Sequence, residues 1–404
     1  MKWLSNALNT CFYYFIKIIL YPYFFLIQNV RFKKNGYKIP KSPALFIGNH
    51  VTNWDGIYVN VMFFNRKIHF IVHDEMFKNP FFSFISGKIL GEIKRSDKIN
   101  DFSAIRETIR YKNEGKDIGI YPEGDIDMFG RLLHIDDSIG KFAKTLKVPI
   151  VLLKINGAHL RSPRWAKRPA RSRLTYEVAR VISREEAAGM TNEELFDTIR
   201  DTISYDEAEY QKTARIKTSG FRRAERLEYG LYYCPKCGAF ETLKSDKNDV
   251  FCTKCGFKAH YNRYCEFESD FPGCPENTRD WDALARKALS EYLDNTENEV
   301  LFEVSDIRYS SVPIGVFFRK FTENTGTLKI FRDKLTFESE TEQFELKYSD
   351  FVKNRLQYKS TLEIYTADRK YRFEKVGTPY WSAYQYSTAI TYIRYADKVK
   401  AASE

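Results

Sequence analysis

The sequence predicts a multidomain protein that starts with a layered α/β domain and ends with a small antiparallel β domain. Between residues 44 and 160, short apolar segments alternate with helix-like segments, which is typical of helices packed on a central, mostly parallel sheet. From Val300 onward, apolar and polar residues alternate with a period of two, which indicates antiparallel strands. At 404 residues, the chain is long enough for two or three separate cores.

The composition changes divide the chain into five predicted segments. They are an aromatic N-terminal segment at 1–35, an α/β domain at 36–220, a cysteine-rich segment at 229–262, a helical linker at 263–298 and a β-rich domain at 299–404. We expect the last domain to be a small antiparallel β-barrel closed by a C-terminal helix, as in the pleckstrin-homology-like superfold that its pattern resembles.

The N-terminal segment combines aromatic residues with scattered lysines. Its apolar run at 11–27 is shorter than the about 20 residues of a spanning helix, and Lys17 and Pro22 interrupt it. It lacks the small-residue cleavage site of a signal peptide. Because Tyr and Phe favour the headgroup level, we expect a helix that lies in the membrane plane. The alternative is an amphipathic hairpin that covers the domain core.

The α/β domain shows one signal for each element. Strands are expected at 44–47, 68–72, 117–121, 149–155 and 174–181, and helices at 54–63, 138–146, from a cap at Asn100-Asp101 to about Asn113, and after a capping box of Thr191 and Glu194. Sites in such domains lie beyond the carboxyl ends of strands. His50 and Glu123 each follow a predicted strand, so we expect their turns to face one pocket.

His50 and Asp55 are a candidate base and its orienting carboxylate. Five residues rotate a regular helix by roughly 140°, so the two side chains meet only if the chain turns between them. Asp55 would then stand near the start of the next helix. The alternative is an N-capping Asp beside a surface His.

The overall charge favours an anionic partner. The net charge is +11 and the pI is about 9.0, which suits a membrane surface, a phosphorylated substrate or nucleic acid. The run 161–173 holds six basic residues and no acid, and it is either a lipid-headgroup contact or a solvated loop.

Two Cys-x-x-Cys pairs predict a metal site. They are Cys234 with Cys237 and Cys252 with Cys255, separated by 14 residues. Four thiolates at this spacing fit a structural, tetrahedral Zn²⁺ and resemble a zinc ribbon. Unpaired structural thiols indicate a reducing compartment. The ribbon mixes Lys with acidic residues and has no basic-aromatic stripe, so nucleic acid is not the expected partner.

Four blocks in the first half resemble the glycerolipid (lysophospholipid) acyltransferase family, and each is weak by itself. The resemblance covers residues 44–155 only. The blocks, in the order of the family, are Asn49-His50-Val-Thr-Asn-Trp-Asp55, Gly91-Glu-Ile-Lys-Arg95-Ser96, Tyr121-Pro-Glu123-Gly124 and Val148-Pro149-Ile-Val.

The resemblance implies transfer of a fatty acyl group from acyl-CoA or acyl carrier protein to the hydroxyl of a lysophospholipid such as 1-acylglycerol 3-phosphate. His50 would be the general base and Asp55 its orienting group. Arg95 would hold the acceptor phosphate. Glu123 would orient acceptor or backbone groups, and N–H groups near Gly124 or at the start of the next helix would bind the oxyanion.

The third block departs from the family after Pro-Glu-Gly. The family continues with a polar residue, Arg and Ser, whereas this chain has Asp125-Ile126-Asp127. Arg131 is a candidate replacement for the missing cation. The departure leaves room for a less acidic acceptor.

No catalytic cofactor is expected. The sequence has no Gly-x-Ser-x-Gly nucleophile elbow, so a covalent acyl-enzyme is not favoured. The family implies a cytoplasmic protein held peripherally or monotopically on the inner membrane face, with membrane lipid as partner. Two alternatives stay open: a hydrolase of the same thioester or lipid, and a non-enzymatic lipid- or nucleic-acid-binding protein.

Overall fold

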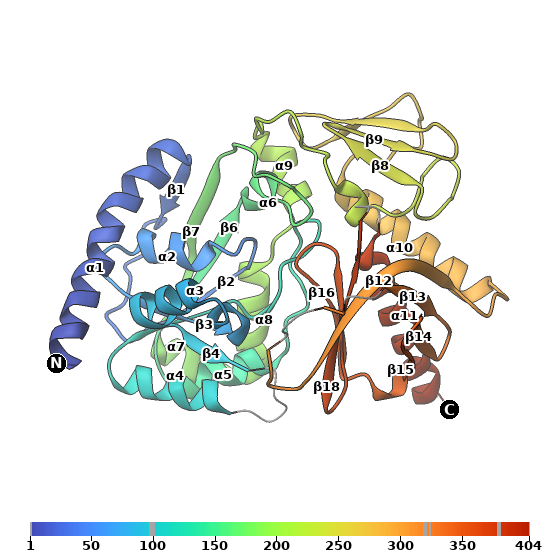
Figure 1. Ribbon diagram of the computed structural model, residues 1–404. Helices are drawn as coiled ribbons and strands as arrows, with labels where there is room; N and C mark the ends of the chain where they lie inside the picture. The colour runs from blue at the N-terminus through green and yellow to red at the C-terminus, as the bar shows by residue number, and fades with distance from the viewer. Residues whose placement is uncertain (1, 97–101, 318–320, 323–324, 378–380, 404) are drawn as a thin grey trace. The chain divides into compact units, whose positions relative to one another are not determined.

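The computed structural model describes residues 2–96, 102–317, 321–322, 325–377 and 381–403 (Figure 1). The chain forms two compact units, residues 1–163 with 169–219, and residues 164–168 with 220–404. The predicted cap at Asn100 and Asp101 lies outside the described residues.

A seven-stranded sheet is the centre of the first unit, with strand order β1-β7-β6-β2-β5-β3-β4. Only β7 and β6 pair antiparallel among its described strands, so the prediction of a mostly parallel sheet is confirmed. The strands are β1 (Val30–Lys33), β2 (Leu45–Gly48), β3 (Ile68–His73), β4 (Ile93–Arg95), β5 (Asp117–Ile120), β6 (Ile150–Asn156) and β7 (Leu174–Ile182).

Helices cover both faces of this sheet, because successive strand residues point to opposite sides. Leu45 and Ile47 pack in the core beneath α5 and α8, while Phe46 packs in the core beneath α2. The helical segments are α2 (Asp55–Met62), η2 (Asp74–Phe77), α3 (Pro80–Phe84), η3 (Ile85–Leu90), α4 (Ser103–Asn113), α5 (Ser138–Leu146), α6 (Ala158–Arg161), α7 (Arg184–Gly189), α8 (Asn192–Ile203) and α9 (Glu207–Ala214).

The N-terminal helix α1 (Lys2–Pro22) continues into a π-helix, η1 (Tyr23–Ile27). Pro22 is the last residue of α1, and the winding changes there from an α-helix to a π-helix, so the helical segment continues past the proline. By length and composition alone, the 20 residues Leu8–Ile27 could cross a membrane, with a mean hydropathy of 1.5 and 17% of the window buried.

The polar side of α1 faces the protein. Lys17 is 2% exposed, and its Nζ donates hydrogen bonds to the carbonyls of Phe63 at 3.1 Å and Arg66 at 2.7 Å, just beyond the end of α2. A cation there complements the negative end of the helix dipole. The exposed apolar side chains of this segment include Leu8, Phe12, Phe15, Ile18, Ile19, Leu26 and Ile27.

The second unit contains two antiparallel sheets. A four-stranded sheet, β8 (Leu243–Asp246), β9 (Asp249–Cys252), β10 (Lys258–Tyr261) and β11 (Phe267–Glu268), follows the short helix η4 (Leu227–Tyr229). The helix α10 (Thr278–Asn295) comes next and buries Trp281, Ala285 and Leu289. Its N-cap is Asn277, whose side chain accepts the N–H of Asp280.

The last seven strands form one antiparallel sheet in the order β15-β14-β13-β12-β18-β17-β16. A β-bulge between Val304 and Ile307 bends the long β12, which pairs first with β13 and then with β18. The elements are β12 (Phe302–Pro313), β13 (Gly326–Ile330), β14 (Lys334–Ser339), β15 (Gln343–Lys347), η5 (Tyr348–Asp350), β16 (Lys353–Gln357), β17 (Thr361–Tyr365), β18 (Arg369–Lys375) and α11 (Ala383–Ser403). The α11 helix packs on β16 and β17, so the predicted strand-rich region with its terminal helix is confirmed.

Candidate active site

The turn between β2 and α2 brings His50 and Asp55 together. His50 Nδ1 lies 3.0 Å from Asp55 Oδ2. Asp55 is the first residue of α2 and is fully buried, whereas 21% of the His50 side chain is exposed. The buried carboxylate can therefore orient an imidazole whose ring remains accessible.

Asp55 is surrounded by hydrogen-bond donors. Its Oδ2 accepts the N–H groups of Val51 at 2.7 Å and Thr52 at 2.8 Å. Its Oδ1 accepts the hydroxyls of Thr52 at 2.7 Å and Tyr176 at 2.8 Å. Because the Asp55 carboxylate accepts hydrogen bonds from all of these groups, His50 Nδ1 is the donor toward Asp55 and Nε2 carries the lone pair.

The pKa of His50 is raised above its ordinary value. Burial lowers this pKa, but the hydrogen bond and the negative charge of Asp55, together with the charges of Glu123 and Asp125, outweigh the burial. The imidazolium form is therefore stabilised, as a group that accepts a proton during a reaction requires.

Tyr121, at the end of β5, forms a flat support for the imidazole. Its ring is stacked on His50 with centroids 4.7 Å apart and an interplanar angle of 11°. Phe70 is also stacked on Tyr121, with centroids 5.0 Å apart and an interplanar angle of 8°. Gly119 makes room for Phe70, because a Cβ at this glycine would lie 2.5 Å from the ring. The His50 ring is thus held by a carboxylate at its edge and by an aromatic ring at its face.

Glu123 joins two loops by their backbones. Its Oε1 accepts the N–H of His50 at 2.6 Å, and its Oε2 accepts the N–H of Leu133 at 2.7 Å. Burial raises its pKa to about 7, although these two N–H groups and the charge of His50 act in the opposite direction. Both oxygens serve the backbone, which suits an orienting carboxylate better than a base.

Arg95 lies beside the Pro-Glu-Gly turn. It ends β4, and its Nη1 is 3.7 Å from the position that a Cβ on Gly124 would occupy. Gly124 has a φ of +67°, so a side chain here would strain the turn as well as press on the guanidinium. The structure therefore brings the second and third blocks of the sequence motif together at the exposed Arg95 side chain.

The two unusual carboxylates after the turn have different environments. Asp127 is 7% exposed, and its Oδ1 accepts the N–H groups of Phe129 at 2.8 Å and Arg131 at 3.0 Å. It therefore shapes its own loop. Arg131 Nε lies 3.8 Å from the same oxygen, so this cation is engaged with Asp127. Asp125 is only half-buried, and its charge contributes to the raised pKa of His50.

The backbone donors expected for an oxyanion are largely engaged. At the start of α2, the N–H groups of Val51 and Thr52 point to Asp55, and those of Trp54 and Asp55 are bonded to Thr52. The Gly124 N–H donates to the Tyr121 carbonyl over a longer distance of 3.3 Å. Of these groups, Gly124 has the weakest internal bond and is the most available donor.

Sequence reasoning did not assign roles to Thr52, Tyr121 and Tyr176. Tyr176 lies 121 positions from Asp55 in the chain and reaches it only because β7 and α2 pack together. Thr52 and Tyr121 lie inside the blocks that resemble the family. The hydroxyl of Thr52, three residues before Asp55, and the aromatic ring of Tyr121, directly before Pro-Glu-Gly, are the sequence features that could have indicated their roles.

The second unit gathers the four predicted cysteines. The Sγ atoms of Cys234, Cys237, Cys252 and Cys255 all lie within 4.8 Å of one another. Gly238 and Gly256, which follow the two pairs, have φ values of +69° and +70°, as the tight turns around a metal require. The group offers four sulfur ligands in a compact arrangement and could hold a Zn²⁺ ion.

Comparison with known families identifies the first unit. Residues 29–155 match the family model described as Acyltransferase. This segment contains the His50–Asp55 turn, Arg95 and the Pro-Glu-Gly turn. This segment of the chain is therefore an acyltransferase domain.

Two solved structures are similar to parts of the chain. The 1-acyl-sn-glycerophosphate (LPA) acyltransferase PlsC from Thermotoga maritima is 17% identical with a TM-score of 0.39, over 50% of this chain and 95% of that one. The C-terminal domain of an unknown protein from Leishmania infantum is 16% identical with a TM-score of 0.17, over 28% of this chain and 96% of that one. No curated protein sequence matches the chain.

Proposed function

We propose that this acyltransferase moves a fatty acyl group from a thioester, on coenzyme A or acyl carrier protein, to the hydroxyl of a lysophospholipid such as 1-acylglycerol 3-phosphate. The observation that carries the proposal is the His50–Asp55 pair at 3.0 Å inside the segment that matches the acyltransferase family.

His50 acts as the general base in this mechanism. Its Nε2 takes the proton of the acceptor hydroxyl while the hydroxyl oxygen attacks the thioester carbonyl. Asp55 stabilises the imidazolium that forms. Collapse of the tetrahedral intermediate expels the thiolate, which regains a proton from the imidazolium, so that an ester and a free thiol are the products.

Residues around His50 position the acceptor and stabilise the charge that develops during the reaction. Arg95 binds the acceptor phosphate from beside the Pro-Glu-Gly turn, and the Gly124 N–H turns to the oxyanion. Arg131 is a weaker candidate for the phosphate because Asp127 engages it. Asp125 lies close enough to raise the pKa of His50, and its charge also leaves room for a phosphodiester headgroup, which is less acidic than the phosphate monoester of 1-acylglycerol 3-phosphate.

The membrane is the proposed source of the acceptor. The exposed apolar face of the N-terminal helix suits insertion in the plane of the cytoplasmic leaflet, while Lys17 faces inward to the end of α2. A helix held in this way on the inner membrane face keeps the His50 turn on the side where acyl thioesters are present.

The test is an assay of purified protein with labelled acyl thioester and a panel of lysolipids. We expect a labelled two-chain lipid with the preferred acceptor, and a loss of about 10³-fold in His50→Ala. The matched control is His134→Ala, an exposed histidine of the same unit. Release of free fatty acid at the same rate without acceptor would identify a hydrolase instead.

We further propose that the four cysteines bind one structural Zn²⁺. All four positions of a tetrahedral ion would be filled by thiolates, so the ion would support the fold of the second unit and leave no position open for substrate.

A further inference from the structure

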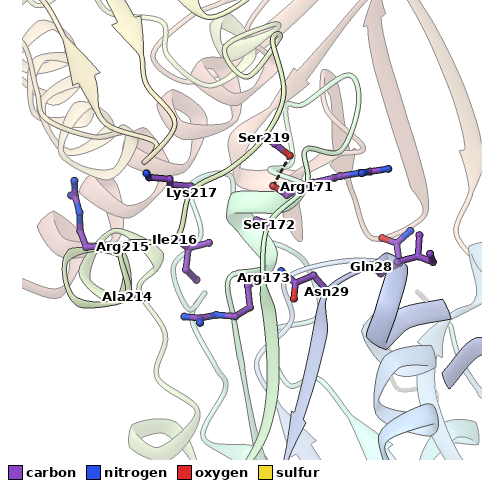
Figure 2. Close-up of a pocket in the computed structure, with 11 residues that line it drawn as sticks. Gln28, Asn29, Arg171, Ser172, Arg173, Ala214, Arg215, Ile216, Lys217 and Ser219 are labelled. Carbon is purple, nitrogen blue, oxygen red and sulfur yellow. Dashed lines mark hydrogen bonds between the residues drawn. The ribbon is translucent and has the colours of Figure 1, made fainter. Parts of the chain in front are cut away.

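A second candidate binding site lies at the end of the N-terminal helix. It is a pocket of about 530 Å³ formed by three segments of the first unit, residues 27–29, 171–173 and 214–219 (Figure 2). The walls are tied together by main-chain bonds, since Arg171 and Ser219 exchange N–H···O bonds of 3.0 and 2.8 Å. Arg161 Nη1 also donates to the Gln28 carbonyl at 2.5 Å and holds the end of the helix segment in place.

The lining is strongly cationic. It contains Arg171, Arg173, Arg215 and Lys217, all with exposed side chains, and its lining residues include no Asp or Glu. In the view of Figure 2 the side chains of Arg173, Arg215 and Lys217 extend to one side, and that of Arg171 extends to the other. Three positive groups on one side favour an anion with several oxygen acceptors, such as a phosphate.

The position of the pocket limits the source of this phosphate. Ile27 lines the pocket and is 60% exposed, and its neighbour Leu26 is 71% exposed. An apolar edge directly beside a group of cations matches the boundary between acyl chains and headgroups in a bilayer. A soluble phosphate compound would gain nothing from these two exposed side chains.

We infer that this pocket binds the phosphate of an anionic phospholipid headgroup, while Leu26 and Ile27 enter the acyl layer beside it. The bound lipid is a docking ligand and is separate from the acceptor proposed near Arg95. The inference rests on the proposed function only in that the protein works at a membrane, and vesicle binding tests it without any acyl transfer.

The experiment is sedimentation of the full-length protein with vesicles of phosphatidylcholine alone or with about 30 mol% phosphatidylglycerol added, which gives the vesicle surface a negative potential. We expect Arg215→Gln/Lys217→Gln to lower partition onto the anionic vesicles about 25-fold, since each cation near such a surface contributes about 5-fold. Partition onto neutral vesicles stays unchanged. The matched control is Lys141→Gln/Arg184→Gln, which removes the same charge from exposed positions of the first unit.

Three results would overturn the inference. One is equal loss in the control pair, which would indicate a general charge effect. Another is an unchanged partition of Arg215→Gln/Lys217→Gln on anionic vesicles. The third is displacement of the wild-type protein from the vesicles by free coenzyme A, which would assign the pocket to nucleotide phosphates. The vesicle measurement does not depend on the proposed function, because His50→Ala is expected to bind vesicles normally whether or not His50 is the base. A failed acyl-transfer assay would therefore leave the docking inference standing, and a failed vesicle assay would leave the base assignment standing.

Discussion

The His50–Asp55 turn and the four-cysteine group show two ways in which a short motif becomes a site. The cysteines need little beyond their own spacing, since the most distant pair in direct contact, Cys234 and Cys255, is 21 positions apart. The His50 turn is shorter but depends on remote parts of the chain. Glu123 binds its backbone from 73 positions away, and Tyr176 binds Asp55 from 121 positions away.

The two sites therefore differ in what a substitution should change. The sulfur group is closed on itself, so its substitution should change the stability of the second unit and leave the chemistry of the first unit alone. The His50 turn keeps one ring accessible, so its substitution should change the rate and leave the fold alone.

The largest effect is expected from loss of Cys234, one of the four proposed zinc ligands. The binding free energy of a structural zinc is about 10–16 kcal/mol, so Cys234→Ser should lower the stability of the second unit by at least about 5 kcal/mol. This corresponds to a fall in Tm of about 10–20 °C by calorimetry. Cys274→Ser is the control and should keep the wild-type Tm, and native mass spectrometry should show one zinc in wild type. A wild-type protein without zinc would contradict the metal site.

Asp55→Asn should reduce kcat by about 10³- to 10⁴-fold, because an amide can neither fix the His50 tautomer nor stabilise the imidazolium. Steady-state kinetics with saturating acceptor measure this effect, and circular dichroism checks that the fold remains. Asp201→Asn, at an exposed helix position, is the charge-matched control. Full activity in Asp55→Asn would remove this carboxylate from the mechanism.

The pH profile should follow the raised pKa of His50. A general base must be unprotonated to act, so kcat/KM should fall on the acidic side of the profile by about tenfold per pH unit. The apparent pKa of this acidic limb should lie above the ordinary histidine pKa of about 6.5. Glu123→Gln should move this limb to lower pH, since it removes a negative charge that favours the imidazolium. A limb that stays fixed in this variant would assign it to another group.

Tyr176→Phe should have the smallest effect, a loss of about 10-fold in kcat, because it removes one hydrogen bond to a charged group and keeps the ring. The acidic limb should also rise in pH, since an Asp55 with fewer donors holds the His50 proton more strongly. Tyr210→Phe, on α9, is the control. If Tyr176→Phe lowers the Tm but leaves the apparent pKa of the acidic limb unchanged, Tyr176 has only a structural role.

Much of the fold could be predicted because its signals are local. The helix at Ser138–Leu146 has the expected ends, and the capping box of Thr191 and Glu194 forms with bonds of 3.0 and 2.7 Å. Strand β1 was missed. Its four residues, Val30–Lys33, carry no alternation that distinguishes them from the aromatic segment, and they become a strand only by pairing with β7.

The candidate site was predictable where the side chains belong to the blocks themselves. His50 and Asp55 could be paired because a turn of five residues has few solutions. The roles of Asp127 and Arg131 could not be predicted, because the sequence does not distinguish an acidic residue that binds its own loop from one that faces a ligand. Tyr176 was hidden because its contact depends on the order of the strands in the sheet.

The inward position of Lys17 has a consequence for membrane topology. If α1 spanned a bilayer, Lys17 would lie in the hydrocarbon layer. Because its ammonium group is hydrogen-bonded to carbonyls at the end of α2, part of the domain would have to enter that layer with it. Burial in the folded domain lowers the pKa of Lys17 to about 7, so about half of the Lys17 side chains are protonated at neutral pH. Under the proposed function, the protein would consequently draw its acceptor from one leaflet and return its product there, and the lipid would need another route to reach the opposite side of the bilayer.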